Sequence, residues 1–406
     1  MNIGLFTNNF PYKLPFSPLP PGSGEYMTGG VGEVAYQLSH TLARRDHSVV
    51  IFTTSANDRD AIETVNSIIL FRKRKTTRIA DTDISLAYLH TGSPVALDLV
   101  HLHAGEPPAT LAALQYLRRH RLPFIVTHHL DPDWGYGSML RRILVFLYAH
   151  GPFMWALAQS DRIIALSEEA AQNSRFLPKF ADKLTVIPNG INPDEFSIPI
   201  DRTEARSRLG LLADEKIVLF MGTISERKGP QILIAALPKI RDRVPDTHLV
   251  LAGAQTPFSN RLNRICREMG LSKHVSFPGY VREDEKALYY RAADLFVLPS
   301  FSEAFPLTVM EAAASGLPAV VSDIAVFRAL VREGETGLFT RTGDTDELAT
   351  AISSLLDDEQ LCREMGENAK EWVKQFSWDA VALATDRLYR ELIGASAGAS
   401  RRNGGV

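Results

Sequence analysis

The sequence predicts an α/β protein made of two doubly wound domains that face each other across a cleft. Its 406 residues exceed what one ordinary hydrophobic core accommodates. Short apolar runs, rich in β-branched residues, alternate with amphipathic helical stretches, a pattern typical of parallel sheets with crossover helices. One stretch rich in proline, asparagine and glycine, VIPNGINPDEFSIP (Val186–Pro199), interrupts this alternation near the middle of the chain. We therefore expect a linker there, with one domain on each side.

The predicted strands fall into two groups. The first group is NIGLFT (2–7), SVVIFTT (48–54), LVHLH (99–103), PFIVTHH (123–129) and RIIALS (162–167). The second is KIVLFMGT (216–223), HLVLAGA (248–254), HVSFPGYV (274–281), DLFVLPS (294–300) and PAVVSD (318–323). Most end in or are followed by Gly, Ser, Thr, Asn or His, and then by a helix. Such residues suit the carboxyl ends of strands, where open α/β sheets bind their ligands.

The linker also sets the expected domain boundaries. A first domain is expected over residues 1–190 and a second over 191–375. A terminal helix is predicted over 376–394, in FSWDAVALATDRLYRELI. The small and polar residues that follow predict a disordered tail over 395–406.

Composition and charge exclude several classes of protein. A formal net charge of -3 provides no global field that would attract nucleic acid or an acidic membrane. The local exception is the basic run FRKRKTTR (Phe71–Arg78), which we interpret as a solvated loop or strand edge rather than a lipid or phosphate patch. Two cysteines, Cys266 and Cys362, are too few for a disulfide framework or a thiolate metal site.

Targeting and membrane signals are weak. The start, MNIGLFTNNF, lacks the basic segment and the apolar length of a signal peptide. The most apolar segment, Ile143–Ala158, is interrupted by Gly151 and Pro152 and is shorter than the ~20 residues that span a bilayer. We interpret this segment as a buried helix and expect a cytoplasmic protein, with a peripheral contact at the inner membrane surface left open.

One segment, SFSEAFPLTVMEAAASGLP (Ser300–Pro318), carries the functional hypothesis. Pro306 suits the first turn of a helix, and the glycine and proline at its end suit a stop. The free amides and dipole at the start of that helix form a site for an anion such as phosphate. Glu303 and Glu311 flank the site, so a ligand with phosphate in the middle and hydroxyls at both ends fits it. A nucleotide sugar has this shape, although two glutamates at this spacing can also serve the dipole alone.

The same segment resembles the E-x7-E region of retaining glycosyltransferases of family 4, the group 1 enzymes related to glycogen synthase and mannosyltransferases, which have the GT-B fold of two Rossmann-like domains. The resemblance extends over nearly the whole chain. The matching stretches, in order, are GGVGEVAYQLSHTLARRDHSVVIFT, DLVHLHAGEPPATLAALQYLRRHRLPFIVTHH, VIPNGINPDEF, GTISERKGP, LVLAGA, VSFPGYV and EGETGLF. It implies that the first domain binds the acceptor, that the second binds the nucleotide-sugar donor, and that the terminal helix crosses back to the first domain.

The resemblance also implies roles for the residues of the second domain. Glu311 would hydrogen-bond the ribose hydroxyls of the donor, and Glu303 would face the sugar or its phosphate. Lys228 would neutralise the departing diphosphate, which gains charge in the transition state. The family often has an arginine where this chain has Thr223, and Arg227 is a candidate replacement. Further donor contacts are assigned to Phe305, Pro306, Leu307 and Thr308.

In the first domain, the glycine cluster Gly29, Gly30 and Gly32 would form a loop that approaches the donor phosphates. Glycine suits such a loop because a Cβ would block close approach and disfavour positive φ. His129 aligns with a family histidine beside the transferred sugar, and its neighbour His128 would point to the opposite face of the strand.

The acceptor side is less defined. Asp131 and Tyr12 are candidate acceptor contacts, although a polar turn explains Asp131 equally well. The proline-rich segment Asn8–Gly30 is expected to cover this side, and its length favours a functional loop. His101 and His103 share one strand face, but without a third ligand we expect packing and hydrogen bonds there and no metal site.

The expected function is metal-independent, retaining transfer of a hexosyl unit from a nucleotide diphosphate sugar to a hydroxyl of a glycan, a lipid-linked or a small-molecule acceptor. No cofactor is expected beyond the donor, whose nucleotide we favour as UDP or GDP. Two alternatives share the architecture: a nucleotide-sugar 2-epimerase and a noncatalytic nucleotide-sugar-binding protein. A dehydrogenase is disfavoured, because the dinucleotide fingerprint and its ribose-binding acid are missing.

Overall fold

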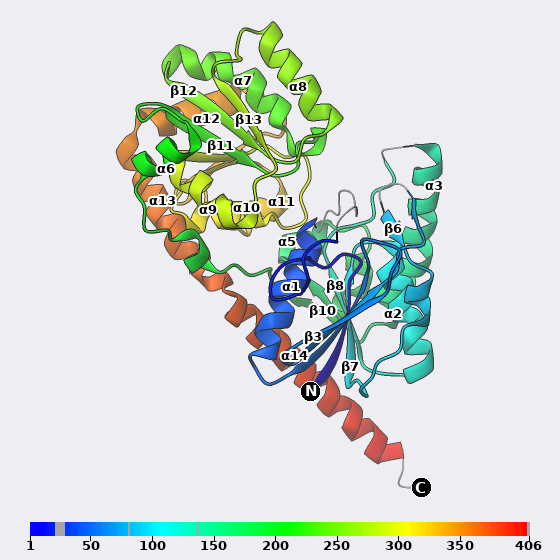
Figure 1. The fold of residues 1–406 in the computed structure, drawn as a ribbon. Coiled ribbons are helices and arrows are strands. Elements are labelled where there is room, and N and C mark those ends of the chain that lie inside the picture. Colours follow the sequence, from blue (N-terminus) through cyan, green and yellow to red (C-terminus); the bar gives the residue numbers. More distant parts are fainter. Residues whose placement is uncertain (21–28, 80–81, 136–137, 404–406) are drawn as a thin grey trace. The chain divides into compact units, whose positions relative to one another are not determined.

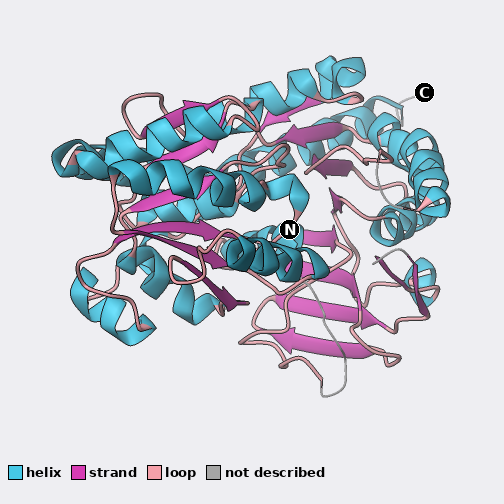
Figure 2. Cartoon of the chain, turned by 90° about the horizontal axis from the view of Figure 1, so that it is seen from above, coloured by secondary structure: helices cyan, strands magenta, loops and turns pink. Residues whose placement is uncertain are grey.

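The computed structural model describes residues 1–20, 29–79, 82–135 and 138–403 (Figure 1). The chain divides into two compact units. Unit 1 comprises Met1–Gly190 together with Trp378–Val406, and unit 2 comprises Ile191–Ser377. Each unit contains a sheet of mainly parallel strands flanked by helices (Figure 2).

Unit 1 has an eight-stranded sheet in the order β10-β9-β8-β7-β1-β2-β4-β3. All neighbours pair in parallel except β3 and β4, which form an antiparallel hairpin at one edge. The strands are β1 (Asn2–Phe6), β2 (Ser48–Thr54), β3 (Ala61–Val65), β4 (Ile68–Lys73), β7 (Leu99–Ala104), β8 (Phe124–His128), β9 (Arg162–Ala165) and β10 (Leu184–Val186). A separate hairpin pairs β5 (Thr77–Ile79) with β6 (Thr82–Ile84).

The helices of unit 1 connect these strands. They are α1 (Gly29–Ala43), η1 (Ala87–His90), α2 (Pro107–His120), α3 (Met139–Tyr148), the π-helical η2 (Ala149–Phe153), α4 (Met154–Gln159), α5 (Glu168–Asn173) and η3 (Leu177–Lys183). Strand order reverses at β1, whose neighbours are β2 and β7. Because parallel crossovers are right-handed, this reversal places α1 and α2 on opposite faces of the sheet.

The long helix α14 (Trp378–Asn403), red in Figure 1, completes unit 1 by packing against α1. Its Tyr389 is fully buried, and the Tyr389 hydroxyl lies 2.6 Å from Nδ1 of His101 in β7. The helix extends beyond residue 394, where the sequence predicted its end. Residues 404–406 lie outside the described part of the chain.

Unit 2 contains an entirely parallel sheet in the order β13-β12-β11-β14-β15-β16. Its strands are β11 (Lys216–Met221), β12 (Thr247–Ala252), β13 (Val275–Gly279), β14 (Leu295–Leu298), β15 (Ala319–Ser322) and β16 (Gly337–Thr340). Its helices are η4 (Pro193–Phe196), α6 (Arg202–Leu209), η5 (Glu226–Lys228), α7 (Pro230–Arg243), α8 (Pro257–Glu268), α9 (Glu283–Ala292), α10 (Leu307–Ala314), α11 (Ala325–Arg328), α12 (Thr345–Asp357), α13 (Glu359–Val373) and η6 (Lys374–Phe376). The central strands are almost fully buried, as expected for a sheet covered on both faces.

The interpretation of the basic run Phe71–Arg78 as a solvated loop or strand edge is wrong for Arg72. This residue lies in β4, between β2 and β3, and only 1% of it is exposed. Its guanidinium donates to Glu63 Oε1 at 3.0 Å and to the carbonyls of Phe10 and Pro11 at 2.9 and 2.7 Å. These acceptors replace water, which makes burial of the charge tolerable. Arg72 therefore anchors the segment that follows β1.

Candidate functional site

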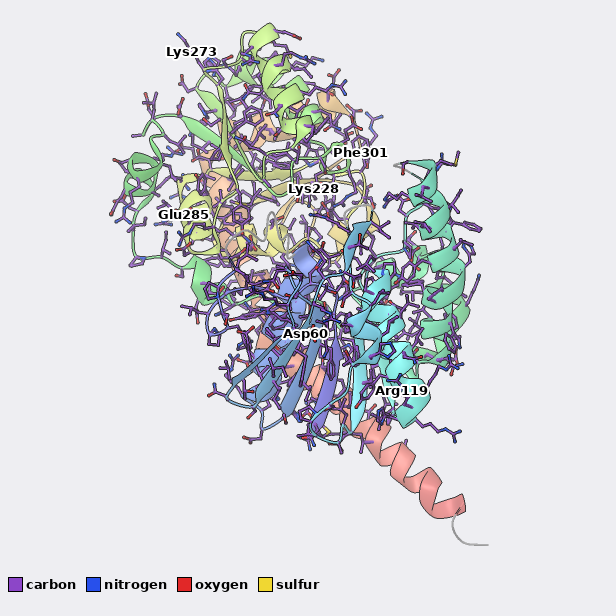
Figure 3. The ribbon with its side chains drawn as sticks, turned by 45° about the vertical axis from the view of Figure 1, so that its right-hand side comes forward. Asp60, Arg119, Lys228, Lys273, Glu285 and Phe301 are labelled. Atoms are coloured by element: carbon purple, nitrogen blue, oxygen red, sulfur yellow. The ribbon has the colours of Figure 1, made fainter. Side chains whose placement is uncertain are left out.

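The candidate site of unit 2 lies where the strand order reverses. β11 and β14 are neighbours, and the next strands along the chain lie on opposite sides of them. The loops that follow two such strands diverge and leave a crevice at their carboxyl ends, where open α/β sheets bind ligands. Lys228 and Phe301, labelled in Figure 3, belong to these two loops. The Phe301 amide donates to the carbonyl of Arg227 at 2.7 Å, which ties the loops together.

Glu303 is the centre of a charge cluster at this crevice. Its Oε1 accepts hydrogen bonds from Lys228 Nζ at 2.6 Å and from Ser300 Oγ at 2.9 Å. Its Oε2 lies 3.3 Å from Nη1 of Arg227, which also donates to the carbonyl of Ser302. Burial alone would raise the pKa of the Glu303 carboxyl, but Lys228 and Arg227 outweigh it and hold the pKa below its ordinary value. The carboxylate is thus kept charged beside two cations.

Gly229 fixes the position of Lys228. Its φ is +74°, and a Cβ there would lie 1.9 Å from the carbonyl oxygen of Pro299. Only glycine allows this turn to pack against the end of β14. Lys228 lies in turn over Gly222, where a Cβ would be 3.3 to 3.5 Å from the outer atoms of its side chain.

The helix α10 begins directly after the loop that carries Glu303. Pro306 precedes its first residue with extended dihedrals, and no described side chain caps this end. The Thr308 hydroxyl in the first turn is buried and has no hydrogen-bond partner among the described residues. An uncapped helix start with an unpaired hydroxyl can accommodate an anionic ligand. Phe305, before the helix, is buried, and its ring centroid lies 6.5 Å from that of Phe376.

Glu311 is held one turn further along α10 by two partners from α9. Its Oε2 accepts a 2.7 Å hydrogen bond from the Tyr290 hydroxyl, and its Oε1 lies 3.2 Å from Lys286 Nζ. Burial would lower the pKa of Lys286, but Glu311 and Glu283 outweigh it and raise that pKa. Glu311 is therefore a fixed carboxylate. Its two partners were missed by sequence reasoning, since no local pattern relates α9 to α10.

Thr223, at the position where the family often has an arginine, is exposed. Arg227, four residues later, contacts Glu303 as described above. The site thus has a second cation at the place where the sequence suggested a replacement for the arginine.

Unit 1 has its own point of strand reversal, between β1 and β7. The loops after these strands bring Asn8, Asn9 and Glu106 together. Glu106 accepts a hydrogen bond from Asn8 Nδ2 and another, at 3.4 Å, from Asn9 Nδ2. Burial raises the pKa of Glu106 to about 7. Sequence reasoning did not assign Glu106 a role, although its place after β7 was a usable signal.

A chain of buried histidines runs beside this point. His103 Nδ1 lies 3.0 Å from Nε2 of His129, and His101 contacts Thr127 at 2.7 Å as well as Tyr389. Burial lowers the pKa of His101 to about 3 and holds the pKa values of His103 and His129 well below their ordinary value. These three imidazoles are neutral at physiological pH. In the described ranges, no group of three or more His, Cys, Asp or Glu residues could hold a metal ion.

The two candidate acceptor contacts are engaged in internal bonds. Asp131 accepts hydrogen bonds from His128 Nε2, Ser174 Oγ and the Arg175 amide at 2.8, 2.6 and 2.7 Å. The Tyr12 hydroxyl accepts from the Ala56 amide at 3.0 Å, and the Arg72 guanidinium lies 3.6 Å from the centre of its ring. Both residues thus organise the carboxyl edge of the sheet.

The expected glycine loop is not a loop in the structure. Gly29, Gly30 and Gly32 lie in the first turn of α1, and none of the positive φ angles recorded for described glycines belongs to them. A Cβ on Gly32 would lie 2.6 Å from the carbonyl oxygen of Asn9, whereas no described atom lies within 4 Å of a Cβ on Gly30, so Gly32 has a steric reason to be glycine and Gly30 does not. The part of the preceding proline-rich segment over 21–28 lies outside the described residues.

Comparison with known proteins gives consistent results. The family model described as Glycosyltransferase Family 4 matches residues 28–195, and the one described as Glycosyl transferases group 1 matches residues 201–372. The D-inositol 3-phosphate glycosyltransferase of Corynebacterium glutamicum is 36% identical over 407 residues, covering 93% of this chain and 95% of that protein.

Two solved structures are similar over almost the whole chain. Sucrose-phosphate synthase from Thermosynechococcus elongatus matches with a TM-score of 0.79 and 26% identity, covering 97% of this chain and 99% of that one. HepE of Anabaena, solved in complex with UDP, matches with a TM-score of 0.71 and 18% identity, covering 96% and 100%.

Proposed function

Because this chain belongs to the family 4, group 1 glycosyltransferases, we propose that it is a retaining, metal-independent hexosyltransferase with a small-molecule acceptor. It is a glycosyltransferase that uses a nucleotide-sugar donor. The stereochemical course, the nucleotide, the sugar and the acceptor are the parts that we propose.

The observation that carries the proposal is the grouping of Lys228, Glu303 and the uncapped start of α10 at the switch point of unit 2. We assign the donor diphosphate to the α10 amides and to Lys228, with Arg227 as the second cation. Lys228 and Arg227, together with the Glu303 carboxylate that both contact, leave one net positive charge, and the dipole of α10 adds to it, so part of the diphosphate charge can be offset without a metal. Glu311, fixed by Tyr290 and Lys286, is assigned to the ribose hydroxyls.

In the proposed reaction the bond between the anomeric carbon and the diphosphate oxygen breaks, and the acceptor oxygen bonds to that carbon on the same face. The acceptor proton passes to the departing phosphate oxygen. Lys228 stabilises the charge that develops on this leaving group. The neutral imidazole of His129 is assigned a place beside the transferred sugar, as a hydrogen-bonding partner that carries no charge.

A phosphorylated cyclitol is the acceptor class that we favour. The support is the similarity to D-inositol 3-phosphate glycosyltransferase along 95% of that protein. We assign the acceptor to unit 1, where Asn8 and Glu106 lie at the switch point of the sheet. Glycan and lipid-linked acceptors are the competing classes.

The first test is a thermal-shift screen with UDP, GDP, ADP and dTDP, of which we favour UDP or GDP. A nucleotide at a hundredfold excess over its Kd adds about 2.7 kcal/mol to the unfolding free energy, which is a readable shift. The shift should disappear in Glu311→Gln and persist in Glu268→Gln, a matched change at an exposed glutamate of unit 2. No shift with any nucleotide would contradict the donor site.

The second test determines the reaction type. The matching sugar nucleotide is incubated with inositol phosphate, and the anomeric configuration of the product is read by NMR. An α-linked product from an α-linked donor supports retention, and a β-linked product contradicts it. Conversion of the donor to its 2-epimer without any acceptor would instead support the epimerase alternative.

A further inference from the structure

Helix α3 carries a stripe of apolar side chains that the rest of unit 1 does not cover. Leu140, Ile143, Leu144 and Leu147 are 63%, 49%, 41% and 59% exposed. Their spacing of i, i+3, i+4 and i+7 places them on one face of the helix. Exposing four large side chains in a row costs free energy in water, so a soluble monomer rarely retains such a stripe.

Neighbouring residues extend this stripe. Met139, Phe146 and, two turns beyond the end of α3, Trp155 in α4 are 68%, 46% and 44% exposed. Tryptophan and phenylalanine are enriched where a protein meets the boundary between lipid headgroups and acyl chains. The apolar surface thus continues from α3 into α4. We call the seven residues the α3 patch: Met139, Leu140, Ile143, Leu144, Phe146, Leu147 and Trp155.

The charged side chains on the helices around the α3 patch are all positive, whereas the loop before α3 carries the exposed Asp133, whose carbonyl accepts a hydrogen bond from Arg141 at 3.2 Å. Helices α2, α3, η2 and α4 contain no Asp or Glu, but they contain Arg118, Arg119, Arg141 and Arg142. Thr110 of α2 lies 2.9 Å from the Tyr148 hydroxyl at the end of α3, so these helices form one layer. Figure 3 shows Arg119 at the lower end of α2. A layer that combines an apolar stripe with cations and lacks acids suits an anionic membrane surface.

A second copy of the chain fits this layer less well. A twofold interface would place the patch against itself, so the four arginines of one copy would face those of the other. The helices of the patch supply no carboxylate to pair with them. The helix also cannot insert across the bilayer, because no helix within the described residues has both the length and the hydropathy of a membrane span.

We propose that the α3 patch docks unit 1 onto an anionic phospholipid surface, with the apolar stripe among the acyl chains and the arginines at the phosphates. Docking of this kind is independent of which donor and acceptor the enzyme uses. Binding follows from buried apolar area and from attraction to anionic headgroups together.

The test is flotation of the full-length protein with lipid vesicles. One set contains phosphatidylcholine alone, and the other contains about 30% phosphatidylglycerol, which supplies the negative surface potential. The wild type should float with the anionic vesicles and much less with the neutral ones. Raising the salt from about 0.1 M to about 0.5 M should weaken binding, because it screens the headgroup charges.

Two double variants distinguish membrane binding by the α3 patch from nonspecific adsorption through other exposed apolar side chains. Leu140→Gln with Leu147→Gln should reduce the partition coefficient at least about tenfold, since each leucine contributes more than one decade when buried. The control, Ile62→Gln with Leu212→Gln, changes side chains that are 66% and 61% exposed, in β3 and in unit 2. It should bind as the wild type does. All four side chains are exposed, so both variants should keep the melting temperature of the wild type.

Three results would overturn the proposal. The first is that the wild type does not float with anionic vesicles, and the second is that it floats equally with neutral ones. The third is an equal loss in both double variants. Light scattering measures the oligomeric state and tests the competing explanation. If the wild type is a dimer that does not bind vesicles, and the Leu140→Gln/Leu147→Gln variant is a monomer, the patch serves self-association.

Discussion

Lys228 Nζ lies 2.6 Å from Glu303 Oε1, so the best-placed cation of the candidate donor site is already paired with a carboxylate. A donor diphosphate must therefore share Lys228 with Glu303 or displace it. The pair orients both side chains, and Lys228 holds the pKa of the Glu303 carboxyl below its ordinary value. In this arrangement the lysine is positioned before the ligand arrives.

Replacing this lysine should affect both catalysis and the neighbouring carboxyl. Lys228→Gln is expected to lower kcat/KM about 10²- to 10³-fold, because it removes a charge that stabilises the leaving group. Lys239→Gln, at an exposed lysine of the same unit, is the control and should leave kcat/KM unchanged. Steady-state kinetics with the donor identified in the screen measure both. Equal kcat/KM in Lys228→Gln and the wild type would remove Lys228 from the reaction.

The same substitution should change the response to acid. The pKa of Glu303 is depressed in the folded protein, so its contribution to stability is present above the unfolded value of about 4.5 and is lost as pH falls through the folded pKa. Without Lys228 this contribution should be smaller at neutral pH. Urea unfolding at pH 7 and pH 4 would show a smaller loss on acidification in the variant.

Tyr290→Phe tests whether Glu311 must be held in place. The substitution leaves Glu311 Oε2 without its buried donor, which should cost about 1 to 3 kcal/mol of unfolding free energy and weaken nucleotide binding. Tyr289→Phe changes the adjacent, half-buried tyrosine and serves as the control. Urea unfolding and a nucleotide titration provide the two measurements. Tight nucleotide binding in Tyr290→Phe would show that the tyrosine acts on stability alone.

Gly229→Ala tests the turn that positions Lys228. Gly229 and Gly210 have similar dihedrals, with φ of +74° and +68°, so alanine at either costs about 1 to 2 kcal/mol from the backbone. Only at Gly229 does the new Cβ meet the Pro299 carbonyl, whereas no described atom lies within 4 Å of a Cβ at Gly210. We expect Gly229→Ala to be the less stable variant and to raise the donor KM. An unchanged KM in Gly229→Ala would mean that the loop adjusts without moving the lysine.

Acid should destabilise unit 1 through its buried histidines. His101, His103 and His129 have lowered pKa values, so below the ordinary value of 6.5 the unfolded chain binds protons that the folded unit does not. Stability should therefore fall as pH decreases from 6.5. Glu106 acts in the opposite direction between about pH 4.5 and 7, because its raised pKa lets the folded unit hold a proton. The net difference of nearly two protons from these four groups is a loss of about 2.5 kcal/mol per pH unit between pH 6 and 5.

Glu106→Gln separates these contributions. The variant removes the offsetting proton, so the slope should become steeper by about 1 kcal/mol per pH unit. Urea unfolding at half-unit intervals from pH 5 to 7 measures both slopes. A stability that does not change with pH in the wild type would contradict the buried, neutral state of the three histidines.

The sheet cores could be predicted from the sequence because apolar strand runs are local. The strands around His101 and around Phe296 follow directly from such runs. The β3–β4 hairpin was not predicted. Its strand β4 contains Arg72, whose burial depends on hydrogen bonds to Glu63 and to carbonyls about sixty residues away. No short stretch of the sequence indicates which distant groups accept hydrogen bonds from an arginine.

The same distinction applies to the site. The uncapped helix after Pro306 can be read from one segment, since proline and glycine mark its ends. The partners of Glu311, which are Tyr290 and Lys286, come from another helix and required the structure. Glu106 was overlooked because its raised pKa depends on burial, which the residues beside it do not reveal.

The inclusion of α14 in unit 1 makes this unit discontinuous, with all of unit 2 inserted between Gly190 and Trp378. During synthesis, unit 2 can be completed and begin to fold while unit 1 still lacks the helix that supplies Tyr389 to His101. The two chain segments that connect unit 1 with unit 2 run side by side. The Ile191 amide donates to the Phe376 carbonyl at 2.7 Å, and a Cβ on Gly190 would touch Trp378. Unit 2 could therefore be excised as one continuous segment and the cut ends of unit 1 joined by a short linker, which would give two separately producible halves of the enzyme.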